Sequence, residues 1–537
     1  MAKKRGKTPD ASPPPPASGG GSPAPAGEKA KKPESALKAG MDFVLVLAGA
    51  VAIALVIKAY LFDVYVIPSG SMETALRGRP DGGDRIFCSK ISYRFRQLRR
   101  WEVAVFEFPY EAAKRSATRE EEADIERYRG QNFVKRMVGL PGETLAVARG
   151  DIWVKRDGES EYRRLVKPDS VQQGMWLNVY EEDFSDLSLK ELQESWSLRG
   201  GAARLDKGGP LRLDPGGETA ALAYRPRVPA GARKDAVAEL PGIPDRYTLR
   251  QPVQFRCSAI REDGSPCATV FVKTVHTHNI HGRCPSCGSL EPETSAIFYH
   301  RRSGLPTWGR YAVNPDYARQ GEDSIRQTDY RFVPDLRVAL DATLSGADSW
   351  LGVRIWEDNR NAEARFHADG RVELLVNGGA SLPEHRALAD IAPGKRETLE
   401  FYVVDGRARA FVGKERKPFL DVQVWNDRQP PVRSLPRASG VVLTAGGAGG
   451  SASKVKIDRD VFYFSGRERP EDAKFGRAMG ARGEIRINGE SFFPMGDHCD
   501  SSYDARSWGA APLANLRGPA LLVWWPPDRI GLIPKPD

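Results

Sequence analysis

One long apolar segment near the N-terminus constrains the fold of this chain more than any other feature. Residues 43–57 carry no charged side chain, and only Asp42 and Lys58 interrupt the wider apolar segment 41–62. A helix over this segment would be about 33 Å long at ~1.5 Å per residue, enough for a hydrocarbon core of ~30 Å. A buried helix is less consistent with apolar residues on all faces. We therefore expect a transmembrane helix over 41–62.

The flanking sequence argues against a cleaved leader and predicts an orientation. Forty residues precede the apolar segment, and no small-x-small cleavage site follows it before residue 65. Residues 1–40 are rich in Pro, Gly, Ser and Ala, which predicts a disordered tail. This tail holds eight Lys or Arg against three acids, so we expect a cytoplasmic N-terminus and an extracytoplasmic remainder.

The overall charge and cysteine count narrow the class of protein. The net charge of +10 is not gathered into a basic arm interleaved with aromatic residues, so it favours anionic lipid over nucleic acid as a partner. Six cysteines in 537 residues are too few for a disulfide scaffold.

Two short segments after the apolar helix combine into a candidate catalytic site. In residues 65–76 a β-branched run ends in Pro-Ser-Gly-Ser-Met, which predicts a strand followed by a turn that carries Ser69 and Ser71. In residues 132–143 the strand pattern places Lys135 on one face with Phe133 and Met137. Burial among apolar side chains lowers the pKa of a lysine amine from its usual ~10.4, so the amine can act as a base. Taken alone, an ordinary turn and a surface lysine explain both segments.

Several sequence blocks, in this order, resemble the type I signal peptidases, membrane-anchored Ser/Lys endopeptidases. The blocks are the apolar segment, IPSGSM at 67–72, GDRI at 83–86, VKRMVGLPGE at 134–143 and MGDHCDSSYDARSWG at 495–509. The resemblance covers roughly residues 41–155 and 480–537. More than 300 residues separate Lys135 from the last block, far more than the family usually has.

The resemblance implies roles for six residues and no cofactor. Ser71 would be the nucleophile and Lys135 its general base. The Ser71 backbone N–H and the Ser69 hydroxyl would form the oxyanion hole. Ser502 would orient Lys135, while Asp504 and Arg506 would form a bracing ion pair. A Ser71/His498 pairing is the less favoured alternative.

The middle of the chain lies outside this resemblance and contains a cysteine cluster. Cys257, Cys267, Cys284 and Cys287 could hold a structural zinc ion, with Cys284 and Cys287 in a CxxC knuckle. The first pair is wider than usual, and His276, His278 or His281 could replace a thiolate. Two disulfides are the alternative, and either role is structural.

Residues 320–466 predict an all-β insertion. Strand-like runs recur at short intervals, and Asp369-Gly370 and Asp405-Gly406 each separate two of them, a strong hairpin signal. The pattern is typical of a sandwich and resembles a laminin-G or concanavalin-like module. Its ligand is unknown.

The sequence therefore predicts a mainly β protein with an N-terminal transmembrane helix. The expected parts are a tail at 1–40, a membrane helix at 41–62, the first part of a catalytic core at 63–155, a cysteine-containing insertion at 156–319, a sandwich-like insertion at 320–466 and the second part of the core at 467–537. The expected function is removal of signal peptides from preproteins by a single-pass enzyme of the bacterial inner membrane. The rival interpretation is a catalytically inactive, membrane-anchored protein that binds a ligand through the insertion.

Overall fold

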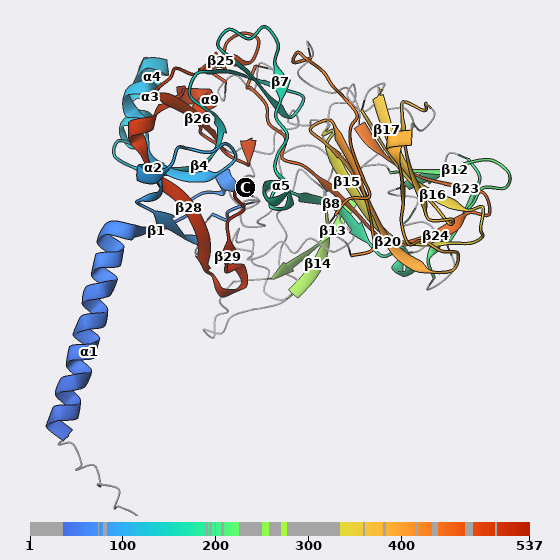
Figure 1. Ribbon diagram of the computed structural model, residues 1–537, viewed down its shortest axis with the longest axis horizontal. Helices are drawn as coiled ribbons and strands as arrows, with labels where there is room; N and C mark the ends of the chain where they lie inside the picture. The colour runs from blue at the N-terminus through green and yellow to red at the C-terminus, as the bar shows by residue number, and fades with distance from the viewer. Residues whose placement is uncertain are drawn as a thin grey trace, which may run out of the picture. The chain divides into compact units, whose positions relative to one another are not determined.

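The computed structural model divides into two compact units, residues 1–57 and 58–537. It describes residues 36–73, 75–78, 83–187, 192, 196–198, 200–205, 209–224, 250–256, 270–276, 333–357, 360–379, 383–414, 417–431, 439–467, 476–499 and 502–536. The described residues are mainly β, as predicted (Figure 1). The four clustered cysteines lie outside the described residues, so the zinc and disulfide alternatives stay predictions.

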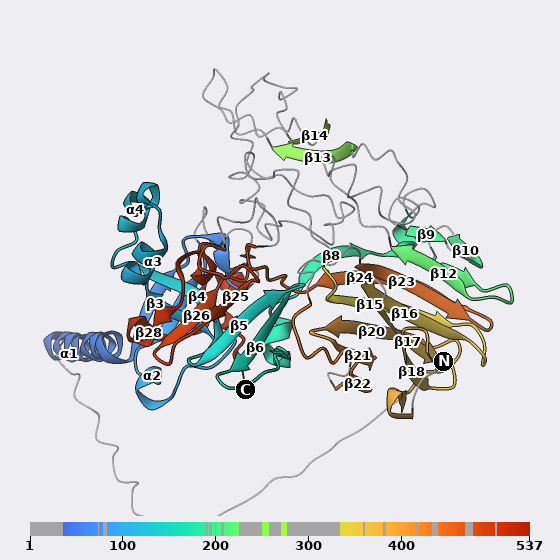
Figure 2. The same ribbon diagram turned by 90° about the horizontal axis from the view of Figure 1, so that it is seen from above.

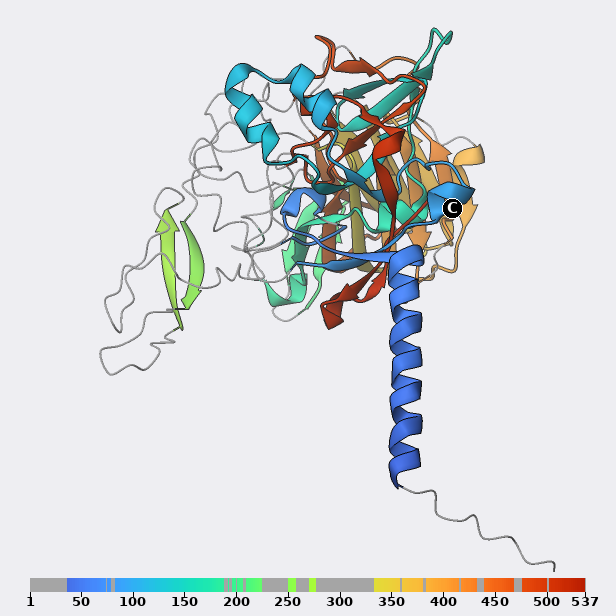
Figure 3. The ribbon, with the colours of Figure 1, turned by 90° about the vertical axis from the view of Figure 1, so that its left-hand side faces the viewer.

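The first unit contains the long apolar helix that the sequence predicts. Helix α1 (Ala36–Val56) is continuous and runs on into a π-helical turn, η1 (Ile57–Leu61) (Figure 3). By length and composition, Met41–Leu61 could cross a membrane, and none of the segment is buried. Apolar side chains exposed on all faces of a helix are costly in water and suit lipid.

The candidate catalytic residues lie in and around an eight-stranded antiparallel sheet in the second unit. Its order is β1-β2-β28-β3-β4-β26-β27, with β29 paired to β28. The strands are β1 (Phe62–Val66), β2 (Arg85–Ser89), β28 (Leu516–Trp525), β3 (Val103–Glu107), β4 (Asn132–Gly139), β26 (Ser491–Met495), β27 (Ala511–Pro512) and β29 (Gly531–Leu532). Strands from before and after the insertion are interleaved in this sheet, because β28 lies between β2 and β3 and β26 pairs with β4.

A small sheet and several short helices complete this catalytic part. The sheet has the order β25-β5-β6-β7, from β25 (Glu484–Arg486), β5 (Glu143–Ala148), β6 (Asp151–Arg156) and β7 (Arg163–Arg164). The helices are α2 (Ser92–Phe95), α3 (Tyr110–Ser116), α4 (Arg119–Glu126), α5 (Asp169–Gln173) and α9 (Ala505–Trp508). Phe106 and Phe492 meet edge to face in the core at 5.4 Å, which ties β3 to β26.

The insertion forms two sheets that share one hydrophobic core (Figure 2). One has the order β10-β11-β24-β15-β20-β21-β22, with β8 on β24; the other has the order β19-β18-β17-β16-β23-β12-β9. The first comprises β10 (Ala202–Leu205), β11 (Leu211–Asp214), β24 (Gly450–Arg459), β15 (Leu336–Leu344), β20 (Arg396–Val404), β21 (Arg407–Val412), β22 (Leu420–Gln423) and β8 (Leu177–Glu182). The second comprises β19 (Arg386–Leu388), β18 (Arg371–Val376), β17 (Arg360–His367), β16 (Trp350–Glu357), β23 (Ser439–Gly446), β12 (Ala220–Tyr224) and β9 (Trp196–Leu198).

Both predicted hairpin turns occur in these sheets. Gly370 and Gly406 adopt left-handed φ values of 87° and 75° between their paired strands. Strands β8 to β12, between residues 177 and 224, join the same sheets. The sequence predicts an amphipathic helix at about 187–198 with Gly/Pro-rich loops around it, and this is wrong for Trp196–Leu198, which form β9 because they pair with β12. In the sequence, a separate antiparallel pair of strands, β13 (Arg250–Arg256) and β14 (Val270–His276), follows β12 and precedes β15. The likeness to laminin-G or concanavalin stays a prediction.

Candidate active site

Ser71 lies in a short 3₁₀ helix, η2 (Gly70–Met72), that directly follows the edge strand β1 and Pro68. Ile67 and Met72 on either side are buried in a small apolar cluster and fix the ends of the turn. Gly83 permits this arrangement because a Cβ atom there would lie 2.2 Å from the Ile67 carbonyl oxygen. The GDRI block therefore packs closely against the residues that lead into the serine turn.

Lys135 reaches Ser71 from the strand β4. Its Nζ lies 2.5 Å from the Ser71 Oγ, and both residues are buried, with 4% and 7% of their surface exposed. Burial lowers the pKa of the Lys135 amine to about 8, and the negative charge of Asp504 opposes only part of that shift. Among the described residues, the Lys135 amine has no carboxylate in ion-pair contact. The site therefore joins a hydroxyl to an amine that is driven toward its neutral form.

The other four residues singled out from the sequence lie around this pair. The exposed Ser69 donates a hydrogen bond from its Oγ to the Ser71 Oγ at 3.3 Å. Ser502 is fully buried, and its hydroxyl has no hydrogen-bond partner among the described residues. A Cβ at Gly496 would lie 2.2 Å from the Ser502 Oγ and 2.4 Å from the Ser71 carbonyl oxygen, so the last sequence block packs directly on the serine turn.

Asp504 and Arg506 form a completely buried ion pair behind the site. The Arg506 Nε and Nη2 donate to the two Asp504 carboxylate oxygens, each at 2.9 Å. Burial alone would raise the pKa of Asp504, but Arg506 and the Gly496 backbone N–H outweigh it and lower the pKa. Asp504 therefore stays ionised near Lys135, with the positive charge of Arg506 beside it.

A second buried ion pair was missed by the sequence analysis. Arg136 donates to both carboxylate oxygens of Asp497 at 2.7 and 2.6 Å, and to the Trp101 carbonyl oxygen at 2.7 Å. The available signal was that Arg136 must point away from Lys135 on the same strand, into the core, where it requires an acid.

The last block also contacts the nucleophile through its backbone. The His498 N–H donates to the Ser71 carbonyl oxygen at 3.1 Å. The Ser71 hydroxyl itself is engaged by Lys135 and Ser69. This geometry supports nucleophilic chemistry with an amine as base.

The sequence also matches proteins of known class. The family described as "Signal peptidase, peptidase S26" matches residues 40–201 and 454–525. The chain is 34% identical over 136 residues to signal peptidase I of Leptolyngbya laminosa, an alignment that spans 25% of this chain and 60% of the relative. It is 25% identical over 164 residues to signal peptidase I of Bacillus amyloliquefaciens, spanning 30% and 73%.

Comparison with solved structures adds little. A protein of unknown function with a galectin-like fold from Bacillus subtilis aligns with 53% of this chain and 98% of its own length, at 6% identity and a TM-score of 0.26. A carbohydrate-binding module from the same organism, CBM66, aligns with 23% and 75%, at 14% identity and a TM-score of 0.18. These likenesses are too remote to assign a fold or a ligand to the insertion.

The two matched segments hold every residue of the site, and most of the insertion lies between them. The first matched segment extends to residue 201, although β8 and β9 already belong to the sheets of the insertion. The chain spans about half the length of the first relatives that it matches, 60% and 41%. These findings support a type I signal peptidase in which an insertion separates the two segments that match the family.

Proposed function

We propose that this chain is a membrane-tethered serine endopeptidase that removes signal peptides from exported preproteins by a Ser71/Lys135 dyad. The contact of 2.5 Å between the Lys135 Nζ and the Ser71 Oγ, buried among apolar side chains, carries the proposal. A nucleophile and its base must lie within hydrogen-bond reach, and the base must be unprotonated at working pH.

The lowered pKa of Lys135 makes the amine a usable base. With a pKa of about 8, about one molecule in ten carries a neutral amine at pH 7, against one in a few thousand for free lysine. The neutral amine takes the proton of Ser71 as its Oγ attacks the scissile carbonyl. It then returns the proton to the leaving amine, and water hydrolyses the acyl-enzyme in the same way.

The residues around the dyad complete the mechanism. The Ser71 backbone N–H and the Ser69 hydroxyl stabilise the oxyanion, and Ser69 already lies within 3.3 Å of the Ser71 Oγ. Ser502 is a positioning residue for Lys135: its buried hydroxyl lacks a partner among the described residues and is free to turn toward the amine. Asp504 and Arg506 hold the segment that carries Ser502.

The pairing of the sheet leaves room for an extended substrate. Among the described residues, β1 pairs only with β2, and residues 132–135 of β4 pair only with β3. Both segments present unpaired backbone groups next to the dyad. A signal peptide would add as a strand there, with small side chains at the −1 and −3 positions.

The anchor completes the proposal. Met41–Leu61 would cross the bacterial inner membrane once, with the basic tail in the cytoplasm and Ser71 outside. Protease added to intact spheroplasts should then digest the bulk of the chain, whereas full protection of the chain would indicate the opposite orientation.

The short contact between Ser71 and Lys135 argues against the rival function, an inactive binding protein, because such a protein would be free to lose this contact.

The direct test is cleavage of a preprotein ending in Ala-x-Ala by the purified chain. Ser71→Ala and Lys135→Ala should each lower kcat/KM at least a thousandfold, because neither half of the dyad works alone. Lys135→Arg should fail as well, since a guanidinium stays protonated. Ser502→Ala should retain a weaker activity. If Lys135→Arg cleaved normally while His498→Ala did not, a Ser/His site would replace this assignment.

A further inference from the structure

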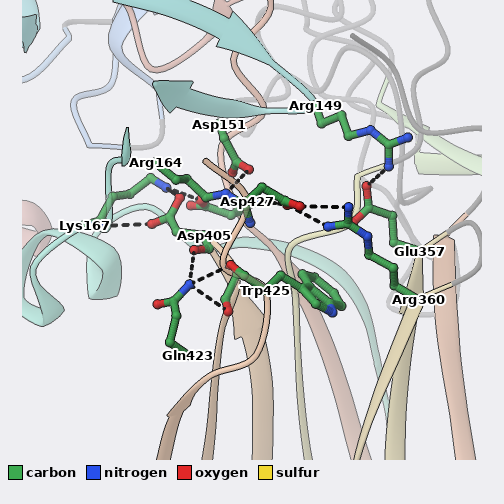
Figure 4. Close-up of polar contacts among 12 residues, drawn as sticks. Arg149, Asp151, Arg164, Lys167, Glu357, Arg360, Asp405, Gln423, Trp425 and Asp427 are labelled. Atoms are coloured by element: carbon green, nitrogen blue, oxygen red, sulfur yellow. Dashed lines mark hydrogen bonds and ion pairs between the residues drawn. The ribbon is translucent and has the colours of Figure 1, made fainter. Parts of the chain in front are cut away.

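A cluster of buried charges joins the catalytic part to the insertion. Asp151 begins β6 of the catalytic part, Asp335 precedes β15, and Asp405 lies in the turn between β20 and β21. One carboxylate oxygen from each lies within 4.8 Å of the others. The exposed fractions of the three residues are 5%, 5% and 1%. Figure 4 shows Asp151 and Asp405 among the neighbouring basic side chains.

Two basic side chains enter the cluster and satisfy only part of it. The Lys167 Nζ lies 2.7 Å from the Asp405 Oδ1 and 2.6 Å from the Asp460 Oδ2 (Figure 4). The Arg164 Nε lies 3.2 Å from the Asp151 Oδ2, and its Nη2 is drawn to Asp427 at 2.6 Å. Both basic groups are therefore already engaged.

The charges do not balance. Four buried carboxylates, those of Asp151, Asp335, Asp405 and Asp460, face the two basic groups of Arg164 and Lys167. With all four carboxylates ionised, two negative charges would remain without compensation from these two groups, and an uncompensated charge in a buried site is very costly. A divalent cation would supply the missing charge.

A second observation points into the same cluster. The Asp151 Oδ1 is buried and has no hydrogen-bond partner. The Asp335 carboxylate makes neither a hydrogen bond nor an ion pair with any described residue, although the residue is buried. Native proteins pair such groups almost without exception, so both carboxylates have unused acceptor capacity that is directed at the cluster.

The donor atoms fit a hard cation. The three candidate ligands are carboxylate oxygens, the atoms that Ca²⁺ and Mg²⁺ prefer over imidazole or thiolate. Oxygens on opposite sides of Ca²⁺ lie about 4.6–5.2 Å apart at bond lengths of ~2.3–2.6 Å, so three oxygens within 4.8 Å can share one ion. Mg²⁺ binds more closely and usually keeps several waters, for which a buried site has less room.

We propose that Asp151, Asp335 and Asp405 bind one calcium ion that links the insertion to the catalytic part. The ion joins a segment that matches the signal peptidase family to two turns of the insertion. It acts as a structural clamp, because its three ligands come from two parts of the chain and none of them belongs to the Ser71/Lys135 dyad.

The rival is retention of protons. Without a cation, burial and the neighbouring carboxylates raise the pKa of Asp335, and protonated acids would satisfy the cluster with no metal. The two alternatives differ in whether Ca²⁺ binds and in which carboxylates that binding requires.

The test uses the full-length protein in detergent, stripped of metal with a chelator that is then removed. Titration with Ca²⁺, followed by calorimetry and by the melting temperature, should show one site that depends on Asp335. Asp335→Asn keeps the side-chain size but removes the charge, so Ca²⁺ affinity should fall at least tenfold and the calcium-induced rise in melting temperature should disappear. Asp151→Asn should do the same and serves if the first variant does not fold.

Glu357→Gln is the matched control. Glu357 is buried at the same interface and pairs with Arg149, but it is not one of the three ligands (Figure 4). Because this variant removes a neighbouring charge but no ligand, its Ca²⁺ affinity should fall far less than tenfold and the calcium-induced rise in melting temperature should persist. Wild-type protein that binds no Ca²⁺, or Asp335→Asn and Asp151→Asn proteins that bind it as tightly as wild type, would overturn the proposal in favour of protons. None of these readouts depends on peptidase activity.

Discussion

The catalytic part and the insertion each bury a charged side chain on a strand, and they treat it in opposite ways. Glu363 on β17 accepts hydrogen bonds from Arg354, Arg365 and Thr444 at 2.7, 2.8 and 3.0 Å. Burial would raise its pKa, but these partners outweigh it and lower the pKa. Lys135 on β4 has the hydroxyl of Ser71 instead of a counter-ion, and its pKa falls to about 8.

The difference separates a structural charge from a chemical one. A buried charge with full partners stays charged and stabilises the fold, whereas one without a counter-ion is driven toward its neutral form. The second arrangement costs stability and provides a base. The predictions below test this contrast between the two regions.

The largest effect on activity is expected when the charge of Lys135 is removed, and removal of the charge of Glu363 is its counterpart in the insertion. Lys135→Met should abolish cleavage yet raise the free energy of unfolding at pH 7 by up to about 3 kcal/mol, because a pKa lowered from 10.5 to about 8 is a cost of folding. Glu363→Gln should leave kcat/KM within twofold but lower stability by about 1–2 kcal/mol. Denaturant melts and cleavage assays on both variants measure this.

The sign of the lysine effect can be checked on the wild type. Between pH 8 and 10.5 the unfolded chain binds more protons at Lys135 than the folded chain does, so this residue makes stability rise with pH there and contributes a constant cost below pH 8. If Lys135→Met were less stable than wild type at pH 7 and equal to it at pH 10, the burial cost would be contradicted.

The next prediction compares two ion pairs, a fully buried one in the catalytic part and a more exposed one in the insertion. Asp497→Asn should lower stability by about 3–5 kcal/mol because it leaves the fully buried Arg136 without its acid. Glu181→Gln on β8 of the insertion removes an exposed acid that pairs with the partly exposed Lys456, and should cost less than about 1 kcal/mol. Equal losses in urea melts would show that burial does not distinguish the pairs.

A smaller effect is expected from glycines that touch each site. Gly496→Ala should lower kcat/KM about ten- to hundredfold, because the added Cβ would lie 2.4 Å from the Ser71 carbonyl oxygen. Gly352→Ala brings a Cβ 2.3 Å from the Thr444 Oγ1 beside Glu363, and should affect stability but not cleavage. Gly489→Ala meets nothing within 4 Å and is the control that should behave as wild type.

Local patterns predicted the strands of the insertion well. In β15 (Leu336–Leu344) buried and partly exposed residues alternate without a break, and the Asp-Gly turns mark the hairpins, so each signal is contained in a few neighbouring residues. Strands β8 to β12 were not predicted because they are short and interrupted by Gly and Pro. Strands β8 and β11 pair with β24, and β12 pairs with β23, each more than 200 residues away, while β9 and β10 pair with β12 and β11.

The candidate site was predicted by motif, not by pattern. Ser71 and Lys135 followed from the resemblance, whereas the pairing of Arg136 with Asp497 requires β26 to lie beside β4, which no local signal indicates. Asp151, Asp335 and Asp405 each read as an ordinary acid in sequence. Only the packing of the insertion on the catalytic part brings them together.

The pH dependence of kcat/KM tests the central claim, that Lys135 is the general base of Ser71, most directly. Measured on a preprotein ending in Ala-x-Ala, it should rise about tenfold per pH unit below about pH 8 and level off above, as the neutral amine forms. A profile that levels off near pH 6.5, the range of an unperturbed histidine, would contradict the claim.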